Sequence, residues 1–119
     1  VNFSYLADIL SERKQLSEFY DSELVGRIHR PKIQANLDYN YAYYPVVFEN
    51  EKELIAAFDR LQKMDIFPRR YFYPSLNTLP YLKEKTNCSV AEDISSRIAC
   101  LPLYVGLNES DIKKICLVF

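Results

Sequence analysis

Glycine is scarce in this chain, with two residues among 119. Loops that cradle phosphate groups need glycine, because their backbone must approach the ligand closely. Gly26 and Gly106 are isolated, and neither belongs to a glycine-rich run. The sequence therefore excludes a nucleotide-binding loop of the Walker or Rossmann type within this chain.

Positive charge is not in excess either, because 15 Lys and Arg residues face 16 Asp and Glu residues. Nucleic-acid binding needs basic residues that neutralise phosphates, so we expect no nucleic-acid partner. No stretch approaches the ~20 apolar residues of a membrane-spanning helix, so we expect no membrane partner. The chain starts at Val1 without a methionine, directly in a helix-like pattern, and we expect it to be a piece of a longer protein.

The cysteines Cys88, Cys100 and Cys116 are widely spaced and form no Cys-x-x-Cys pair. Since His29 is the only histidine, the usual ligands of zinc are missing and we expect no metal site. Cys100 and Cys116 stand among apolar residues and are predicted to be buried, reduced thiols. Reduced thiols are typical of a reducing compartment, which predicts a cytoplasmic protein.

What the chain has is the composition of one globular domain, with 49% hydrophobic and 26% charged residues. Apolar periodicity predicts a helix over residues 3–21, and aromatic and β-branched residues predict strands over 39–48 and 69–73. Capping boxes predict three further helices, which start at Asn50, Ser89 and Asn108. The prediction is an α/β (α+β) fold, a small sheet with helices packed on it.

The helix that starts at Ser89 is predicted to turn Val90, Ile94, Ile98 and Leu101 inward. In the helix that starts at Asn50, the predicted apolar stripe consists of Leu54, Ile55, Phe58 and Leu61.

Few residues are candidates for catalysis. His29 lies in an irregular stretch, where a solvated loop histidine is expected rather than a catalytic one. Neighbouring carboxylates such as Glu92 and Asp93 fit helix caps and solvated faces better than acid–base chemistry.

Residues 68–74 (PRRYFYP) place two arginines beside three aromatic residues. A guanidinium group can bind two phosphate oxygens at once, and aromatic faces stack on a base or a sugar. On an alternating strand, Arg69, Tyr71 and Tyr73 would share one face. The segment is thus either part of a site for an anionic, ring-bearing ligand or a sheet strand with aromatic packing and solvated arginines.

A second aromatic group lies at Tyr39, Tyr41, Tyr43 and Tyr44. The first three would share one face of the strand predicted over 39–48. That face is a ligand-facing wall, a subunit interface, where tyrosine is enriched, or ordinary sheet packing.

Three segments together resemble one family. Residues 40–48 (NYAYYPVVF), 69–76 (RRYFYPSL) and 100–107 (CLPLYVGL) are similar to the small domain of sugar-nucleotide aminotransferases of the DegT/DnrJ/StrS type, in order and with matching spacing. The resemblance covers roughly residues 39–119. Residues 1–24 resemble the helix that joins the two domains of the family, so residues 25–119 are expected to be the C-terminal small domain of a fold-type I enzyme dependent on pyridoxal phosphate (PLP).

The resemblance implies an enzyme that moves an amino group from glutamate, the amino donor, to a keto sugar on a nucleoside diphosphate. The Schiff-base lysine and the aspartate that pairs with the pyridine nitrogen belong to the large domain of the family, and no residue here matches them. We therefore assign no catalytic residue, and expect this chain alone to be inactive and to bind no PLP. The family also implies a homodimer, formed mainly through the large domain.

On the substrate side, the resemblance implies that Arg70, Tyr71 and Tyr73, with Tyr41, bind the sugar nucleotide. The Arg-Arg-Tyr-Phe-Tyr-Pro form is most similar to members acting on dTDP-linked 6-deoxy sugars for cell-surface polysaccharides or natural products. Ser75 and Leu76 depart from the histidine that many members have after the proline, which leaves the sugar and its keto position open. The alternatives are a non-catalytic regulatory or binding domain related to this family and an unrelated α/β domain.

Overall fold

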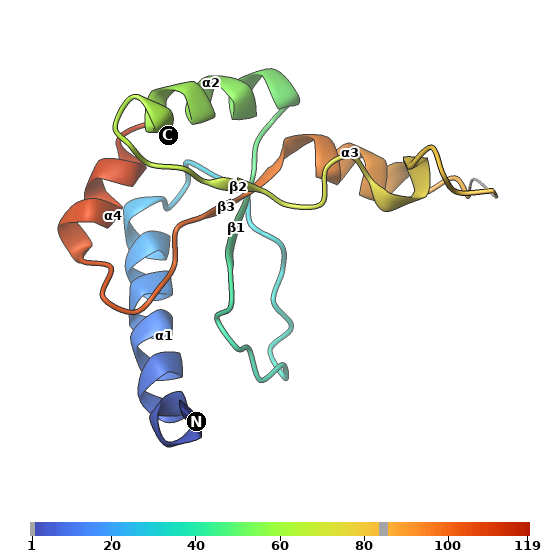
Figure 1. Cartoon of the computed structure of the whole chain (residues 1–119). Coiled ribbons are helices and arrows are strands. Elements are labelled where there is room, and N and C mark those ends of the chain that lie inside the picture. Colours follow the sequence, from blue (N-terminus) through green and yellow to red (C-terminus); the bar gives the residue numbers. More distant parts are fainter. Residues whose placement is uncertain (1, 84–85) are drawn as a thin grey trace.

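The computed structural model describes residues 2–83 and 86–119, so Val1 of the predicted inter-domain helix lies outside it. Figure 1 shows the path of the chain from the N-terminus to the C-terminus. The elements in chain order are η1 (Asn2–Tyr5), α1 (Leu6–Glu23), β1 (Tyr44–Val47), α2 (Glu51–Gln62), β2 (Arg69–Arg70), η2 (Leu76–Thr78), α3 (Ser89–Arg97), β3 (Ile98–Leu101) and α4 (Glu109–Cys116).

The sheet has the strand order β1-β3-β2, and both pairings are antiparallel. Ala99 in the central strand lies opposite Val46 on one side and Arg70 on the other. An isolated bridge between His29 and Val47 attaches the segment after α1 to the outer edge of β1. The small sheet lies where α3 and the loop before β1 extend away from the other helices (Figure 1).

The core lies between the sheet and the helices α1, α2 and α4. Helices α1 and α4 pack against each other beside the sheet, and α2 crosses at its end (Figure 1). The fully buried side chains come from all these elements: Tyr20, Leu24, Tyr44, Val46, Leu54, Leu61, Ile112 and Ile115. This arrangement confirms the predicted small sheet with helices packed on it.

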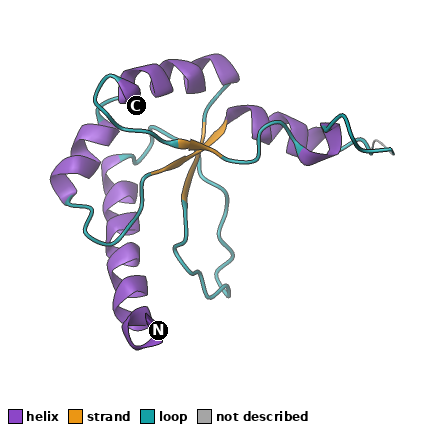
Figure 2. Cartoon of the chain, in the orientation of Figure 1, coloured by secondary structure: helices purple, strands orange, loops and turns teal. Residues whose placement is uncertain are grey.

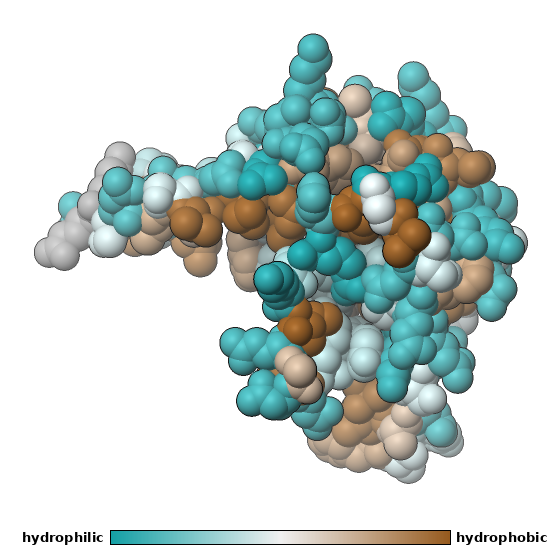
Figure 3. All heavy atoms as spheres, turned by 180° about the vertical axis from the view of Figure 1, so that it is seen from behind, coloured by the Kyte–Doolittle hydropathy of each residue, from teal (hydrophilic) through white to brown (hydrophobic). Residues whose placement is uncertain are grey.

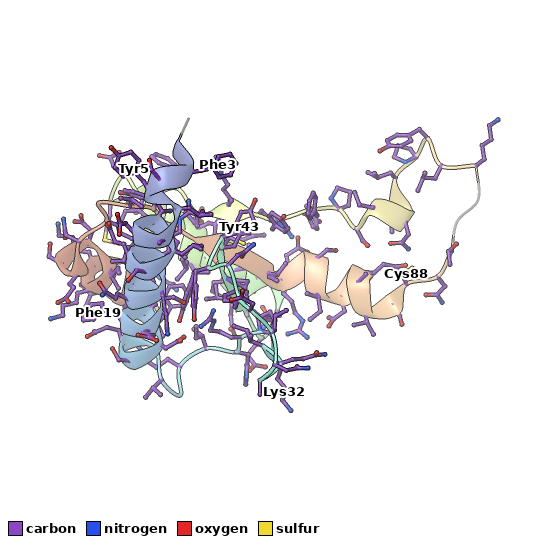
Figure 4. All side chains as sticks on the ribbon, turned by 90° about the horizontal axis from the view of Figure 1, so that it is seen from below. Phe3, Tyr5, Phe19, Lys32, Tyr43 and Cys88 are labelled. Atoms are coloured by element: carbon purple, nitrogen blue, oxygen red, sulfur yellow. The ribbon has the colours of Figure 1, made fainter. Side chains whose placement is uncertain are left out.

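Helix α1 is buried along only part of its length. Leu16, Ser17 and Tyr20 are buried, whereas residues 3–8 are exposed and residues 9–15 are exposed or half-buried. Phe3 at the start of the chain is 80% exposed, and Figure 4 shows it with Tyr5 at the free end of the helix. Polar neighbours such as Arg13 and Lys14 accompany a weak apolar stripe here, so packing against α4 begins only at Leu16.

Two of the three predicted helix starts are confirmed by their caps. The side chain of Asn50 accepts a hydrogen bond from the backbone N–H of Glu53 at 3.0 Å, and Asn108 accepts one from Asp111 at 2.9 Å. At the third, the cap position is Cys88 and Ser89 already lies in the helix, without a side-chain cap bond. Glu92 instead accepts from the Cys88 N–H at 3.2 Å.

Both predicted strands are shorter than expected, because a residue in each adopts a positive φ. Tyr41 has φ 49° and Phe72 has φ 48°, values that an extended strand does not allow. The chain therefore leaves the extended conformation in residues 39–43 and after Arg70. The prediction that Tyr39, Tyr41 and Tyr43 share one strand face is wrong, and so is the shared face predicted for Arg69, Tyr71 and Tyr73.

The helix predicted from Ser89 is also shorter than expected. Ile98 and Leu101 belong to the central strand β3 rather than to the helix, and Val90 is exposed. In α2, Ala57 is buried in place of Ile55, which is exposed. Cys100 and Cys116 are buried, unpaired thiols, as predicted.

Residues 71–83 and 86–97 project from the other described residues, which are called the body, and together form the arm (Figures 1 and 3). The arm contains η2 and α3, and its other described residues are loops and turns, which Figure 2 shows in teal. Ser75 is the one buried residue among those described in the arm. Phe72, Leu76 and Val90 are exposed, and Figure 3 shows apolar surface along the arm. No helix in the described part of the chain has the length and apolar character to cross a bilayer.

Candidate functional site

Arg70 lies at the end of β2, where the arm begins. Its Nη2 atom donates to a carboxylate oxygen of Glu51 and to the backbone carbonyl of Ser96, the latter at 2.8 Å. Its guanidinium carbon lies 3.3 Å from the centroid of the Tyr73 ring, a cation–π contact. Arg70 therefore joins the first residue of α2, the last turn of α3 and the aromatic segment of the arm.

Tyr71 points to a different partner. Its ring lies 5.0 Å from the ring of Tyr43 and 4.1 Å from that of Phe72. Hydrogen bonding with the Tyr43 side chain raises the pKa of Tyr71 above its ordinary value. Figure 4 labels Tyr43 near the base of the arm. The aromatic segment of the arm is thus in direct contact with the loop that precedes β1.

Tyr41 joins this loop rather than the arm. Its ring makes an edge contact with Tyr39 at 5.0 Å, and the Tyr39 hydroxyl donates to the Tyr43 carbonyl at 3.1 Å. Tyr39 and Tyr41 line a hollow of about 600 Å³ between α1 and the loop, together with Lys14. The structure therefore places Tyr41 on the same loop as Tyr43, and its link to Tyr71 runs through Tyr39 and Tyr43.

A second hollow of about 550 Å³ borders the site on the side of Arg69 and Tyr43. Its walls are mostly apolar and include Ile66, Phe67 and Leu103. Mostly apolar pockets with a few polar groups at the rim are typical of small-molecule sites. Arg69 and Tyr43 thus place a cation and a phenol at the edge of an apolar hollow.

Sequence reasoning missed Glu51 and gave no separate role to Tyr43. Acidic residues are common in the first turn of a helix, because the helix dipole stabilises a negative charge there. Nothing in the sequence therefore distinguished Glu51 as a partner of Arg70. Tyr43 was one of four clustered tyrosines, and its contact with Tyr71 spans 28 positions along the chain, from 43 to 71. Such a contact is fixed by the fold and leaves no local pattern.

The described lysines all lie on the surface of the molecule. An internal aldimine needs a lysine whose amine is desolvated or otherwise activated. Every lysine within residues 2–83 and 86–119 is exposed, and Lys14 and Lys114 pair with carboxylates on the surface. The same residues contain no group of three or more His, Cys, Asp or Glu that could hold a metal ion.

Known proteins resemble this chain in sequence along its whole length. The sequence model of the DegT/DnrJ/EryC1/StrS aminotransferase family matches residues 1–119. The dTDP-4-amino-4,6-dideoxy-D-glucose transaminase of Escherichia coli is 28% identical over 97% of this chain and 33% of its own length. GDP-perosamine synthase of Vibrio cholerae is 30% identical over 91% of this chain and 31% of its own length.

A solved structure shares the fold as well. A DegT DnrJ EryC1 StrS aminotransferase from Brucella abortus matches with a TM-score of 0.84 and 25% identity, over 97% of this chain and 31% of that chain. This chain belongs to the DegT/DnrJ/EryC1/StrS aminotransferase family. It spans about a third of the length of the relatives it matches.

Proposed function

We propose that this chain is the C-terminal small domain of a PLP-dependent aminotransferase that transfers an amino group from glutamate to a nucleotide-linked keto sugar. The observation that carries the proposal is the family match over all 119 residues, to relatives named for amino sugars on dTDP and GDP. Residues 1–24 form the inter-domain helix and residues 25–119 the small domain. The cofactor and the Schiff-base lysine belong to the rest of the protein, because every described lysine here is exposed.

Arg70, Tyr71, Tyr73 and Tyr41 are the substrate-binding residues in this proposal. Tyrosine rings stack on a base or a sugar, and a guanidinium group attracts the diphosphate. The exposed rings of Tyr73 and Phe72 give such a ligand an aromatic surface, and the contact between Tyr71 and Tyr43 makes that surface continuous with the loop before β1. The proposed substrate is a dTDP-linked 6-deoxy keto sugar, made for cell-surface polysaccharides or natural products.

The whole protein is proposed to be a cytoplasmic homodimer that associates through its large domain. The isolated chain is expected to be inactive, since no group described in it can carry the chemistry of PLP. Purified residues 1–119 mixed with PLP and then reduced with borohydride should give no site-specific adduct by mass analysis. A stoichiometric adduct on one lysine would contradict the assignment of the cofactor site to another domain.

The direct test uses the full-length protein with PLP, glutamate and either a dTDP-linked or a GDP-linked 4-keto-6-deoxy sugar. Formation of the amino sugar, measured by mass spectrometry, should match the 2-oxoglutarate released. Transfer to the dTDP-linked sugar at the higher kcat/KM supports the proposal in full. Transfer to the GDP-linked sugar alone would overturn the choice of nucleotide. Transfer to neither of these sugars nor to their 3-keto isomers would favour a non-catalytic regulatory or binding domain.

A further inference from the structure

The junction between the arm and the body combines an aromatic contact, Tyr71 on Tyr43, with a group of charged contacts around Arg70. No arm residue other than Ser75 is buried in the part of the arm that the structure describes. At the junction, Arg70 connects Glu51 of the body to Ser96 and Tyr73 of the arm. We propose that Glu51 is a positioning residue that acts through Arg70 to fix the first residues of the arm, 71–75, with the Tyr73 ring.

The position of each group in its helix favours this arrangement. Glu51 is the first residue of α2, where the helix dipole stabilises a negative charge. The carbonyl of Ser96 lies in the last turn of α3, where the dipole stabilises a positive charge. The guanidinium of Arg70 therefore lies between the negative end of one helix and a carboxylate at the positive end of another.

Burial makes the carboxylate of Glu51 important for Arg70. The Arg70 side chain is 22% exposed, against 41% for Glu51. The Nε atom of Arg70 is buried and has no hydrogen-bond partner among the described residues. Loss of the Glu51 charge would leave a mostly buried cation with the Ser96 carbonyl and the Tyr73 ring, and such a cation gains by turning toward solvent. Tyr73 and the backbone around it would then lose their support.

A second arginine, Arg97, attaches the end of α3 to the body without involving Glu51 or Arg70. Arg97 donates from Nη1 to the Phe48 carbonyl at 2.8 Å, and the Arg97 carbonyl accepts from the Phe48 N–H at 2.9 Å. Arg97 also pairs with Asp93 within α3. Because this attachment does not involve Glu51, its loss is not expected when Glu51 is changed, and α3 should stay in place.

The first measurement is hydrogen exchange of the full-length protein, wild type against Glu51→Gln. We expect exchange at the Thr78 N–H, which donates to the Ser75 carbonyl at 2.9 Å, to rise about fivefold, because local opening follows the loss of the contacts that hold a segment. Exchange in α4 should not change. Glu49→Gln is the matched control, because it removes the same charge two positions before Glu51. The Glu49 side chain is exposed and pairs with His29 rather than with Arg70. Unchanged exchange at the Thr78 N–H of the Glu51→Gln variant would overturn the proposal.

The second measurement rests on the proposed function and follows amino transfer. Glu51→Gln should raise KM for the nucleotide sugar about three- to fivefold, the range that a partly exposed ion pair supplies. The kcat value and KM for glutamate should stay at the wild-type level, since a general loss of structure would lower kcat as well. Equal changes in all three constants would contradict a positioning role.

A double variant shows whether Glu51 acts through Arg70. Residues that act as one unit have non-additive effects, so Glu51→Gln in an Arg70→Gln background should raise neither KM nor exchange any further. Additive effects would overturn the proposed route. Since hydrogen exchange needs no substrate, it decides on the positioning role even if the wild-type protein transfers no amino group, which would instead refute the proposed function.

Discussion

Replacing Tyr20 by alanine should destabilise the chain more than most single substitutions. The Tyr20 side chain is fully buried, its ring lies 4.5 Å from the ring of Tyr44, and its hydroxyl donates to the Pro102 carbonyl at 2.9 Å. Truncation of a large buried side chain costs about 3–5 kcal/mol, and the stacked ring pair accounts for about 1 kcal/mol of it. A domain of this length has a free energy of unfolding of about 6–15 kcal/mol, so the loss is a large fraction.

Tyr20→Phe separates the two contributions, because it keeps the ring and removes only the hydroxyl. We expect it to lower the free energy of unfolding by about 1 kcal/mol, the net value of one hydrogen bond. Urea denaturation followed by circular dichroism measures both variants, and Tyr81→Ala is the control, since Tyr81 is 75% exposed. The reasoning is refuted if Tyr20→Ala costs less than about 1 kcal/mol, or if Tyr20→Phe costs as much as the alanine variant.

Three further predictions concern helix starts, acid and thiol reactivity. Asn108→Ala removes the cap of α4 and should cost about 1 kcal/mol in urea denaturation; no loss would mean that the cap bond is replaced by water. Arg70 holds the pKa of Glu51 below its ordinary value of 4.5, so its contribution to stability is present above pH 4.5 and is lost as pH falls through the lowered pKa. Urea denaturation between pH 3 and 7 should show that loss in the wild type and a weaker one in Glu51→Gln; equal pH dependence in both would refute it. Burial raises the pKa of the Cys116 thiol to about 11, so iodoacetamide at pH 8 should alkylate the partly exposed Cys88 first, and mass analysis showing Cys116 labelled first would contradict its burial.

Features fixed by neighbouring residues were predictable from the sequence. The caps at Asn50 and Asn108 each depend on a side chain and an N–H group three positions away, so the sequence pattern contains both partners. The burial of Cys100 and Cys116 followed from their apolar neighbours. The overall architecture was also predictable, because the apolar side of each predicted helix and strand needs another element to cover it.

Features fixed by distant partners were not predictable. Ile98 and Leu101 have a spacing that fits a helix face, but pairing with β1 and β2 draws them into the central strand. The composition of the aromatic segments predicts extended strands, but Tyr41 and Phe72 have positive φ values. No local sequence pattern indicates these values. In the candidate site, Arg70 was predicted from its residue type, whereas its use of Glu51 depends on a contact across 19 positions.

The central position of β3 has a consequence for how this domain is made. Both ladders of the sheet pair with β3, yet their other strands, β1 and β2, come earlier in the chain. During synthesis, neither strand finds its partner until residues 98–101 have left the ribosome. Until then Tyr44 and Val46 belong to an unpaired edge, and such edges are where growing chains aggregate. Premature termination before Ile98 should therefore abolish the whole sheet rather than shorten it by one strand.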